Sequence, residues 1–291
     1  QSTGLVEISS TLSDGTARGT GIIWTSDGTV VTNHHVVAGA TAIKVTDVAT
    51  GQSYTATYVG GDATADVAVL RLEGASGLTP AALAPTAAGA DDAVTAVGDA
   101  GGDGGTLTAS PGTVTALGQH ITVREDDGSA ASLSGLIEVH AYVVPGDSGG
   151  AVLNSDGEVV GMNVAASAGS REVSGYAIPI AEVSSVVQQI LSGPESSTID
   201  LGYNGYLGVG LDPRSQAPLV ARTTTRSGAA TAGIGAGDTI TSVDGHAVAT
   251  VTELRALLAR TSPGDRVEVG WTDAGGAAHT AEVTLVDGPV A

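Results

Sequence analysis

The sequence contains no cysteine and no phenylalanine, and only one methionine and two tryptophans among its 291 residues. Without cysteine the chain has no disulfide, no thiolate nucleophile and no cysteine-ligated metal site. Hydrophobic residues still make up 42% of the chain, so a sizeable core is expected, built mainly from Val, Ile, Leu and Ala. A chain of this length is expected to fold as two domains.

Basic residues are also scarce. The chain has 11 Lys and Arg against 31 Asp and Glu, and its formal net charge is −20. Binding to nucleic acid or to an anionic membrane surface depends on clustered positive charge, so neither partner is expected. No apolar run approaches the roughly 18 residues of a membrane-spanning helix. The chain begins at Gln1 without the basic and apolar segments of a signal peptide.

Glycine is abundant, with 43 residues, and residues 5–123 alternate short apolar runs with turns that contain Gly and Asp. Strands that recur at such short spacing predict a β-barrel or a β-sandwich. Residues 157–167 and 175–180 continue the pattern. The period changes at 181–193, where apolar residues recur with helical spacing and predict an amphipathic helix.

A polar stretch marked by glycine, residues 193–204, is predicted to be a linker. It separates a first domain, 1–192, from a second domain, 205–291. The second domain contains an amphipathic helix at 252–260, which follows the Thr-x-x-Glu spacing of a capping box. The chain is therefore predicted to have two domains, both mostly β.

The stretch VPGDSGG, residues 144–150, places Ser148 in a glycine-rich loop that would expose its hydroxyl group. The backbone N–H groups of Gly146 and Ser148 would then form an oxyanion hole for acyl transfer. The same letters also suit an ordinary surface loop. Taken alone, this stretch does not decide between the two interpretations.

The order of the other polar residues selects between two hydrolase folds. A G-x-S-x-G pattern is also typical of α/β-hydrolases, but that fold needs Asp and then His after the serine. Only His246 and His279 follow Ser148, and both lie in the second domain. The opposite order, His then Asp then Ser, fits TNHHVV at 32–37 and Asp66, which directly precedes an apolar run. An aspartate there is unusual unless it is paired, and orienting a catalytic histidine is such a pairing.

Five ordered motifs, TNHHVV, DVAVLRL, PGDSGG, GEVVGMNVA and GYAIPI, resemble those of HtrA (DegP-like) serine proteases. GYLGVGL and GIGAGDTITSVDGHAV in the second domain resemble their PDZ domain. The resemblance is greatest to secreted actinobacterial members of the PepA type. It implies a mainly β fold, with a chymotrypsin-like antiparallel double β-barrel followed by a PDZ domain, which is a partly open α+β barrel.

The resemblance also implies which residues are catalytic. The family motif around the catalytic histidine is T-N-x-H-V. By this motif His35 would be the general base, and the adjacent His34 would occupy the variable position. Asp66 would orient His35, and Ser148 would be the nucleophile. His34 is expected to face solvent or a neighbouring loop.

The implied oxyanion hole comprises Gly146, Asp147 and Ser148. Many relatives carry Asn at the position of Asp147, whereas many trypsin-like enzymes carry an Asp that pairs with a new amino terminus. No evident processing site precedes the barrel here, so the partner of Asp147 is left open. A contact with His140 and a plain surface position for His140 are the two alternatives.

The resemblance places Tyr142, six positions before the nucleophile, at the base of the specificity pocket. Without an acidic group there, small or medium apolar residues such as Ala, Val or Leu are expected before the cleaved bond. The remaining substrate-binding residues implied by the family pattern are Asn163, Val164, Ala165 and Tyr176.

In the second domain the family pattern implies a loop whose backbone N–H groups hold a peptide carboxylate while the peptide adds as a strand. The alternative is that this stretch is simply a first strand. The residues of the implied peptide-binding loop are Tyr206, Leu207, Gly208 and Val209.

The expected function is that of an ATP-independent serine endopeptidase, without metal or cofactor, that degrades unfolded or damaged proteins outside the cytoplasm. Its PDZ domain would recognise peptide C-termini. Relatives form trimers, so a homo-oligomer is considered, and any signal or anchor segment is absent from this chain. Two alternatives remain, a latent protease that acts mainly as a chaperone-like peptide-binding protein, and a hydrolase of small esters.

Overall fold

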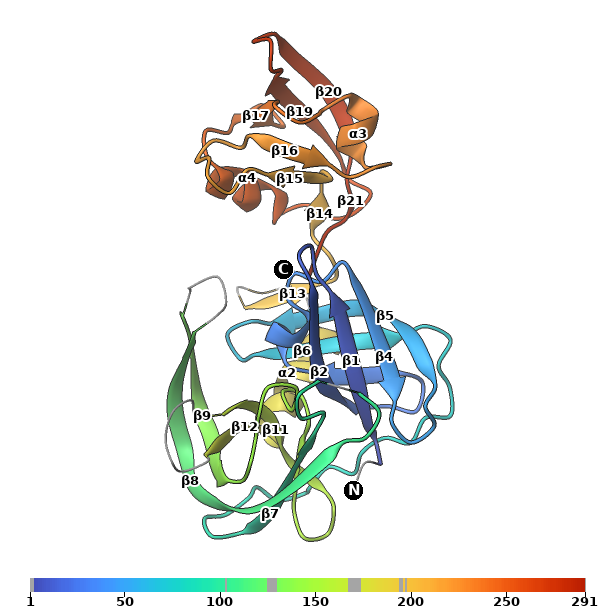
Figure 1. Cartoon of the computed structure of the whole chain (residues 1–291), viewed down its shortest axis with the longest axis vertical. Coiled ribbons are helices and arrows are strands. Elements are labelled where there is room, and N and C mark those ends of the chain that lie inside the picture. The colour runs from blue at the N-terminus through green and yellow to red at the C-terminus, as the bar shows by residue number, and fades with distance from the viewer. Residues whose placement is uncertain are drawn as a thin grey trace. The chain divides into compact units, whose positions relative to one another are not determined.

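The computed structural model divides the chain into two compact units, 1–202 and 203–291, which are described separately (Figure 1). The structure describes residues 3–102, 104–124, 130–166, 174–193, 196 and 198–290. Within these ranges it gives the backbone but not the side chains of six strand residues, 123, 124, 130, 131, 165 and 166.

The first unit begins with an antiparallel barrel. Its strands follow the order β5-β4-β1-β2-β3-β6, and β6 closes the barrel by pairing with β5. A one-turn helix, α1 (His34–Val37), follows β3. The strands are β1 (Leu5–Thr11), β2 (Thr16–Ile23), β3 (Thr29–Thr32), β4 (Ala42–Asp47), β5 (Ser53–Asp62) and β6 (Val67–Leu72).

A second closed barrel follows in the same unit, with the strand order β10-β11-β12-β9-β8-β7. Helix α2 (Ile180–Ser192) comes after its last strand and buries the apolar positions that predicted it, so the sequence-based prediction of this helix is confirmed. The strands are β7 (Ala93–Gly98), β8 (Thr108–Arg124), β9 (Ala130–His140), β10 (Ala151–Leu153), β11 (Val159–Ala166) and β12 (Gly175–Pro179).

The two barrels share one hydrophobic core. The same cluster contains Leu5 and Ile22 from the first barrel, Met162 and Ile178 from the second, and Val183 from α2. Because these aliphatic side chains pack directly across the contact between the barrels, residues of both barrels are held in fixed positions along that contact. The segments that carry His35, Asp66 and Ser148 meet there.

The prediction of a linker at 193–204 is wrong for part of that stretch. Ile199–Leu201 forms strand β13, which pairs with β5, and Ile199 is buried in the core of the first unit. The two units divide between Gly202 and Tyr203. The polar residues around Ile199 gave the stretch the composition of a linker, whereas its strand pairing depends on a distant partner.

The second unit contains one four-stranded sheet, β18-β17-β19-β20, and two strand pairs, β14-β21 and β15-β16. The predicted capping box is confirmed, because the Thr250 hydroxyl accepts from the N–H of Glu253 and the Glu253 carboxylate accepts from the N–H of Thr250. No helix in the described part of the chain is long and apolar enough to cross a membrane. The elements are β14 (Gly205–Tyr206), β15 (Val209–Leu211), β16 (Val220–Thr223), α3 (Gly228–Ala232), β17 (Thr239–Val243), β18 (His246–Ala247), α4 (Val251–Leu258), β19 (Arg266–Thr272), β20 (Ala278–Thr284) and β21 (Val286–Asp287).

Candidate active site

His35 and Asp66 form a hydrogen-bonded pair in the first barrel. The Nδ1 atom of His35 lies 2.8 Å from Oδ2 of Asp66, and the backbone N–H of His35 donates to Oδ1 at 2.9 Å. A carboxylate only accepts hydrogen bonds, so this contact places the ring proton on Nδ1 and leaves Nε2 as the basic atom. The His35 side chain is 35% exposed and that of Asp66 only 8%, so the base is accessible and its partner is not.

The backbone around Asp66 is held in an uncommon conformation. Asp66 has a φ of 54°, in the left-handed region that Asp tolerates better than most residues. The side chain of Asn33, which directly precedes α1, donates to the carbonyl of Asp66 at 3.0 Å. Asn33 therefore links the turn that carries Asp66 to the helix that carries His35.

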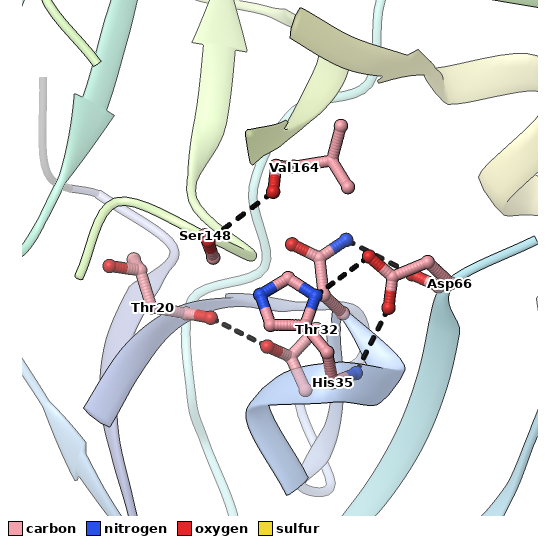
Figure 2. A network of polar contacts seen from close by, with 7 residues as sticks. Thr20, Thr32, His35, Asp66, Ser148 and Val164 are labelled. Carbon is pink, nitrogen blue, oxygen red and sulfur yellow. Dashed lines mark hydrogen bonds and ion pairs between the residues drawn. The ribbon is translucent and has the colours of Figure 1, made fainter. Parts of the chain in front are cut away.

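Ser148 lies on the side of the His35 ring opposite Asp66 (Figure 2). In this structure its hydroxyl group donates to the carbonyl oxygen of Val164 on β11, with the two oxygens 3.4 Å apart. The first barrel supplies the base and its orienting carboxylate, and the loop before β10 in the second barrel supplies the nucleophile. The structure thus brings together the three residues that the sequence analysis named as catalytic.

The loop around Ser148 needs glycine for steric reasons. Gly146 and Gly149 have φ angles of 100° and 83°. A Cβ atom on Gly146 would lie 2.1 Å from the carbonyl oxygen of Asp99, and one on Gly149 would lie 2.0 Å from that of Thr20. Any side chain at these positions would displace the loop and Ser148 with it.

One predicted oxyanion donor is the N–H of Gly146. The carbonyl of Pro145, in the same peptide unit, accepts from the N–H of Gly101 at 2.9 Å. In a trans peptide the N–H points away from the C=O. The N–H of Gly146 is thereby aimed away from Gly101, and it donates to no described residue.

The second predicted donor, the N–H of Ser148, is oriented in the same way. The carbonyl of Asp147, which shares its peptide unit, accepts from the N–H of Gly150 at 2.9 Å. The N–H of Ser148 likewise finds no acceptor among the described residues. Both predicted donors are thus left unused by the described residues, as donors to an oxyanion must be.

Thr20 on β2 fixes this loop, although nothing in the sequence had singled it out. Its N–H donates to the carbonyl of Ser148 at 2.8 Å and its hydroxyl donates to the carbonyl of Gly146 at 2.9 Å. Thr32 in turn donates to the carbonyl of Thr20 at 2.7 Å (Figure 2). A threonine in a β-strand is too common to be recognised as a site residue from sequence.

Asp147, the third residue of the predicted oxyanion hole, is not a donor there, because its N–H donates to the carbonyl of Val144 at 3.0 Å. Its side chain is buried next to the nucleophile. Its Oδ2 accepts from the N–H of Val144 at 2.9 Å, whereas Oδ1 has no hydrogen-bond partner among the described residues. Burial, together with the nearby carboxylate of Asp99, raises the pKa of Asp147, and the Val144 bond opposes this rise. His140 is exposed and makes no hydrogen bond to Asp147, so of the two alternatives the surface position of His140 is the one observed.

The expectation that His34 faces solvent or a neighbouring loop is wrong, because the residue is buried against Tyr58 of strand β5. His34 is only 7% exposed and its ring meets that of Tyr58 edge to face, with centroids 6.4 Å apart. Burial lowers the pKa of His34, against the opposing effect of nearby Asp66 and Asp200. The adjacent histidines lie in the single turn of α1, where successive side chains diverge around a helix instead of alternating across a strand.

The residues predicted to bind substrate differ in exposure. Tyr142 is 59% exposed, so it does not form the closed base of a pocket in this structure. It lines a surface cavity of about 480 Å³. The cavity residues are Pro111, Gly112, Thr113, His140, Ala141 and Tyr142.

Asn163 is fully buried, which leaves its side chain no direct contact with substrate. Its carbonyl accepts from the N–H of Gly149 at 2.9 Å, so it supports the serine loop from behind. Val164 is also buried and presents its carbonyl to Ser148. Tyr176 is half-buried, with its pKa raised by burial and by Glu138. The side chain of Ala165 lies outside the described residues.

The predicted peptide-binding loop of the second unit precedes β15. The carbonyl of Leu207 accepts from Ala229 at 3.0 Å and that of Gly208 accepts from Thr224 at 2.8 Å. By the geometry of the trans peptide, the N–H groups of Gly208 and Val209 point the other way. Leu207 is fully buried, so its side chain is not available to a ligand.

Tyr206 donates its phenolic hydrogen to the carbonyl of Val209 at 3.0 Å. Gly208 has a φ of 85°, and a Cβ there would lie 2.0 Å from Cβ of Ser227. Glycine is therefore required at this turn. Tyr206 and Gly208 together set the entry of the chain into β15.

Two closed antiparallel barrels with His35, Asp66 and Ser148 at their contact define a trypsin-fold peptidase unit. The comparisons agree with this class. The family described as "Trypsin-like peptidase domain" matches residues 19–162, and the family described as "PDZ domain" matches residues 205–285.

Curated relatives show the same combination. The chain is 30% identical over 288 residues to the serine protease PepD of Mycobacterium tuberculosis. This alignment covers 92% of this chain and 60% of the relative. It is 35% identical over 262 residues to the periplasmic pH-dependent serine endoprotease DegQ of Escherichia coli, covering 86% of this chain and 55% of the relative. The chain thus spans little more than half the length of these relatives.

Solved structures are similar over one or both units. The HtrA-type protease AlgW with a tripeptide has a TM-score of 0.58 at 25% identity, covering 98% of this chain and 94% of that one. The Rv3671c protease of M. tuberculosis in its active form has a TM-score of 0.58 at 26% identity, covering 68% of this chain and 85% of that one. The chain belongs to the HtrA (DegP-like) family of trypsin-fold serine proteases.

Proposed function

We propose that this chain is an ATP-independent serine endopeptidase that acts on unfolded or damaged proteins outside the cytoplasm. The observation that carries the proposal is the 2.8 Å contact between His35 and Asp66, which leaves Nε2 of the ring as a base beside Ser148. The relative DegQ is named as a periplasmic endoprotease, which supports both the reaction and the location.

The proposed reaction follows the geometry. The Oγ of Ser148 attacks the carbonyl carbon of a peptide bond while Nε2 of His35 takes its proton, and the oxyanion accepts from the N–H groups of Gly146 and Ser148. His35 then gives the proton to the departing amine, which leaves an acyl ester on Ser148. Water, activated by the same imidazole, hydrolyses the ester and restores the serine. Asp66 holds the ring in its tautomer throughout.

Digestion of β-casein by the wild-type chain and by Ser148→Ala, with fragment masses as the readout, tests this proposal. We expect fragments from the wild type only, and the residues at their ends identify what is accepted before the cleaved bond. Equal digestion by both proteins would refute Ser148 as the nucleophile. Turnover of small esters without casein cleavage would favour an ester hydrolase, and silence on both substrates would favour the latent, chaperone-like alternative.

We also propose that the second unit binds the free C-termini of peptides. The support is the orientation of the N–H groups of Gly208 and Val209. The carbonyls in the same two peptide units are hydrogen-bonded within the unit, so these N–H groups point in the opposite direction. A carboxylate bound there would let the preceding residues pair with β15 as an added strand. Fluorescence anisotropy with one peptide in free-acid and C-terminally amidated forms tests this, because only the free acid should bind.

A homo-oligomer, which the family resemblance implies, remains a prediction of the sequence analysis. Light scattering coupled to gel filtration measures the mass of the particle directly. A mass near three times the 28.3 kDa of the chain would support a trimer, and a mass near that of one chain would refute it under the conditions used.

A further inference from the structure

The arginine side chain of Arg222 lies across the strand that is proposed to receive a peptide. Arg222 on β16 pairs with Gly210 on β15. A Cβ atom on Gly210 would lie 2.7 Å from both Cγ and Nε of Arg222. The aliphatic stem of Arg222 therefore occupies the space above Gly210, and its guanidinium group has already crossed from one strand to the next.

The charge of Arg222 is not neutralised within the unit. Arg222 is exposed and forms no ion pair with any described residue. Asp212, the acidic residue that follows β15, already binds Arg214 with 3.3 Å between Oδ1 and Nε. A positive charge thus stands over β15 with no negative partner among the described residues, although the whole protein carries a net charge of −20.

The opposite edge of β15 has no strand beside it in the described unit, because β15 pairs with β16 alone. A peptide whose carboxylate sits on the N–H groups of Gly208 and Val209 runs antiparallel to β15 along that edge. Its last residue then lies beside Val209 and its penultimate residue beside Gly210. Residues directly opposite each other in a sheet project to the same face. The penultimate side chain therefore shares a face with Arg222.

We infer that Arg222 makes the second unit select C-terminal peptides with Glu or Asp at the penultimate position. Neighbouring strands are about 4.8 Å apart, so the penultimate residue lies one strand beyond the Gly210 that the arginine stem already covers. The antepenultimate side chain projects to the opposite face, because successive residues of a strand alternate. An acidic group there should gain nothing from Arg222. This inference rests on the proposed recognition of peptide C-termini.

The test uses the full chain carrying Ser148→Ala, so that peptides are bound but not cut, and measures peptide affinity by fluorescence anisotropy at low salt. Four labelled free-acid peptides ending in Ala-Glu-Val, Ala-Gln-Val, Glu-Ala-Val and Gln-Ala-Val form two Glu/Gln pairs, one at the penultimate and one at the antepenultimate position. We expect the penultimate Glu to bind about two- to five-fold more tightly than Gln, in the range of an exposed ion pair. The antepenultimate Glu should show no such gain, and 0.5 M salt should reduce the gain of the penultimate Glu.

Arg222→Gln should abolish the preference while the Gln peptides keep their affinity. Arg260→Gln is the matched control, since it removes the same charge from an exposed arginine of the same unit that likewise forms no ion pair with a described residue, and it should leave the preference intact. An undiminished preference in Arg222→Gln, or an equal gain from the antepenultimate Glu, would overturn the inference while C-terminal recognition stands. Absence of binding by every free-acid peptide, or equal binding of an amidated one, would overturn both.

Discussion

The hydroxyl of Thr20 and the carbonyl of Gly146 are joined by a 2.9 Å hydrogen bond that ties the first barrel to the serine loop of the second. The same hydroxyl accepts from the N–H of Asp99, also at 2.9 Å. The backbone N–H of Thr20 holds the carbonyl of Ser148. Thr20 is fully buried, and it holds the peptide unit before and the peptide unit after the one that contains the N–H of Ser148.

Thr20→Val should lower kcat with little change in KM. Valine has nearly the same shape, but it leaves the carbonyl of Gly146 and the N–H of Asp99 buried without a partner. Each such group costs about 1–3 kcal/mol, so the loop shifts to recover solvent or other partners, and the oxyanion donors move with it. We expect a fall in kcat of about ten- to a hundred-fold, below the loss seen when a whole donor is removed.

Steady-state kinetics on a peptide substrate measure this effect, and thermal melting measures the accompanying loss of stability. Thr20→Ser keeps the hydroxyl and should recover most of kcat, which a purely structural role for the methyl group would not predict. A valine variant with the kcat of the wild type would show that Thr20 does not position the loop.

Asp66→Asn should reduce kcat by roughly four orders of magnitude, the size of loss typical when this carboxylate is replaced by an amide in trypsin-like enzymes. The Asn oxygen can keep the bond from the N–H of His35, but the amide NH₂ then faces Nδ1. Nδ1 must accept, so the ring proton moves to Nε2 and the base is lost. Kinetics with a chromogenic peptide, together with NMR of the imidazole nitrogens, report both consequences.

Asp62→Asn is the matched control for that change. Asp62 is also buried, at the end of β5, and its Oδ1 accepts from the N–H groups of Thr64 and Ala65 in the turn that leads to Asp66. An Asn oxygen serves these donors as well, so kcat should stay within a few-fold of the wild type. Comparable losses in the two variants would mean that Asp66 acts through the fold of the turn and not through the histidine.

The catalytic residues were predictable because their evidence is local and ordered along the chain. TNHHVV, the aspartate before an apolar strand and the glycine-flanked Ser148 each depend on a short motif. Thr20 had no such signal, since its role arises from contacts with Gly146 and Asp99, which are far away in sequence. The position of β13 was missed for the same reason, as strand pairing with β5 outweighs the polar composition of the segment.

The exposure of the predicted substrate-binding residues could not be predicted from sequence motifs. Asn163 is fully buried and Tyr142 is 59% exposed, and neither value can be read from residue type. Exposure in a barrel depends on which face of the strand the register presents, and β11 has an irregular register next to Asn163. A shift of one residue moves a side chain to the opposite face.

His34→Phe should make the protein less sensitive to acid. Burial lowers the pKa of His34 in the folded chain, below the value of about 6.5 for an unfolded histidine. The stability that comes from this difference is fully present above the unfolded pKa and is lost as the pH falls toward the lowered one. Phenylalanine does not titrate and can keep the edge-to-face contact with Tyr58.

Urea unfolding at pH 7.5 and pH 5.5 measures the effect. The loss of unfolding free energy between these two values should be smaller in His34→Phe than in the wild type. His120→Phe, which changes an exposed histidine, should retain the wild-type loss. If His34→Phe loses as much stability on acidification as the wild type, the buried His34 is not a source of acid sensitivity.

Asp147→Asn should stabilise the protein increasingly as the pH rises. Burial and the carboxylate of Asp99 raise the pKa of Asp147 in the folded chain, above the value of about 3.9 for an unfolded aspartate. Folding then favours the protonated form of Asp147. The stability that this group contributes to the folded wild type is complete below its unfolded pKa and is lost as the pH rises through its folded pKa. Asparagine keeps an oxygen for the N–H of Val144 and carries no charge at any pH.

The measurement is the difference in melting temperature between Asp147→Asn and the wild type from pH 4 to pH 8. That difference should grow from pH 4 upward and become constant once Asp147 is ionised in the folded wild type. Asp14→Asn, at an exposed turn, should give a difference that does not vary in this way. A difference that widens on acidification would mean that the carboxylate form of Asp147 is the favoured one, with a cationic group bound at Oδ1. A constant difference would place the effect of asparagine in packing and not in charge.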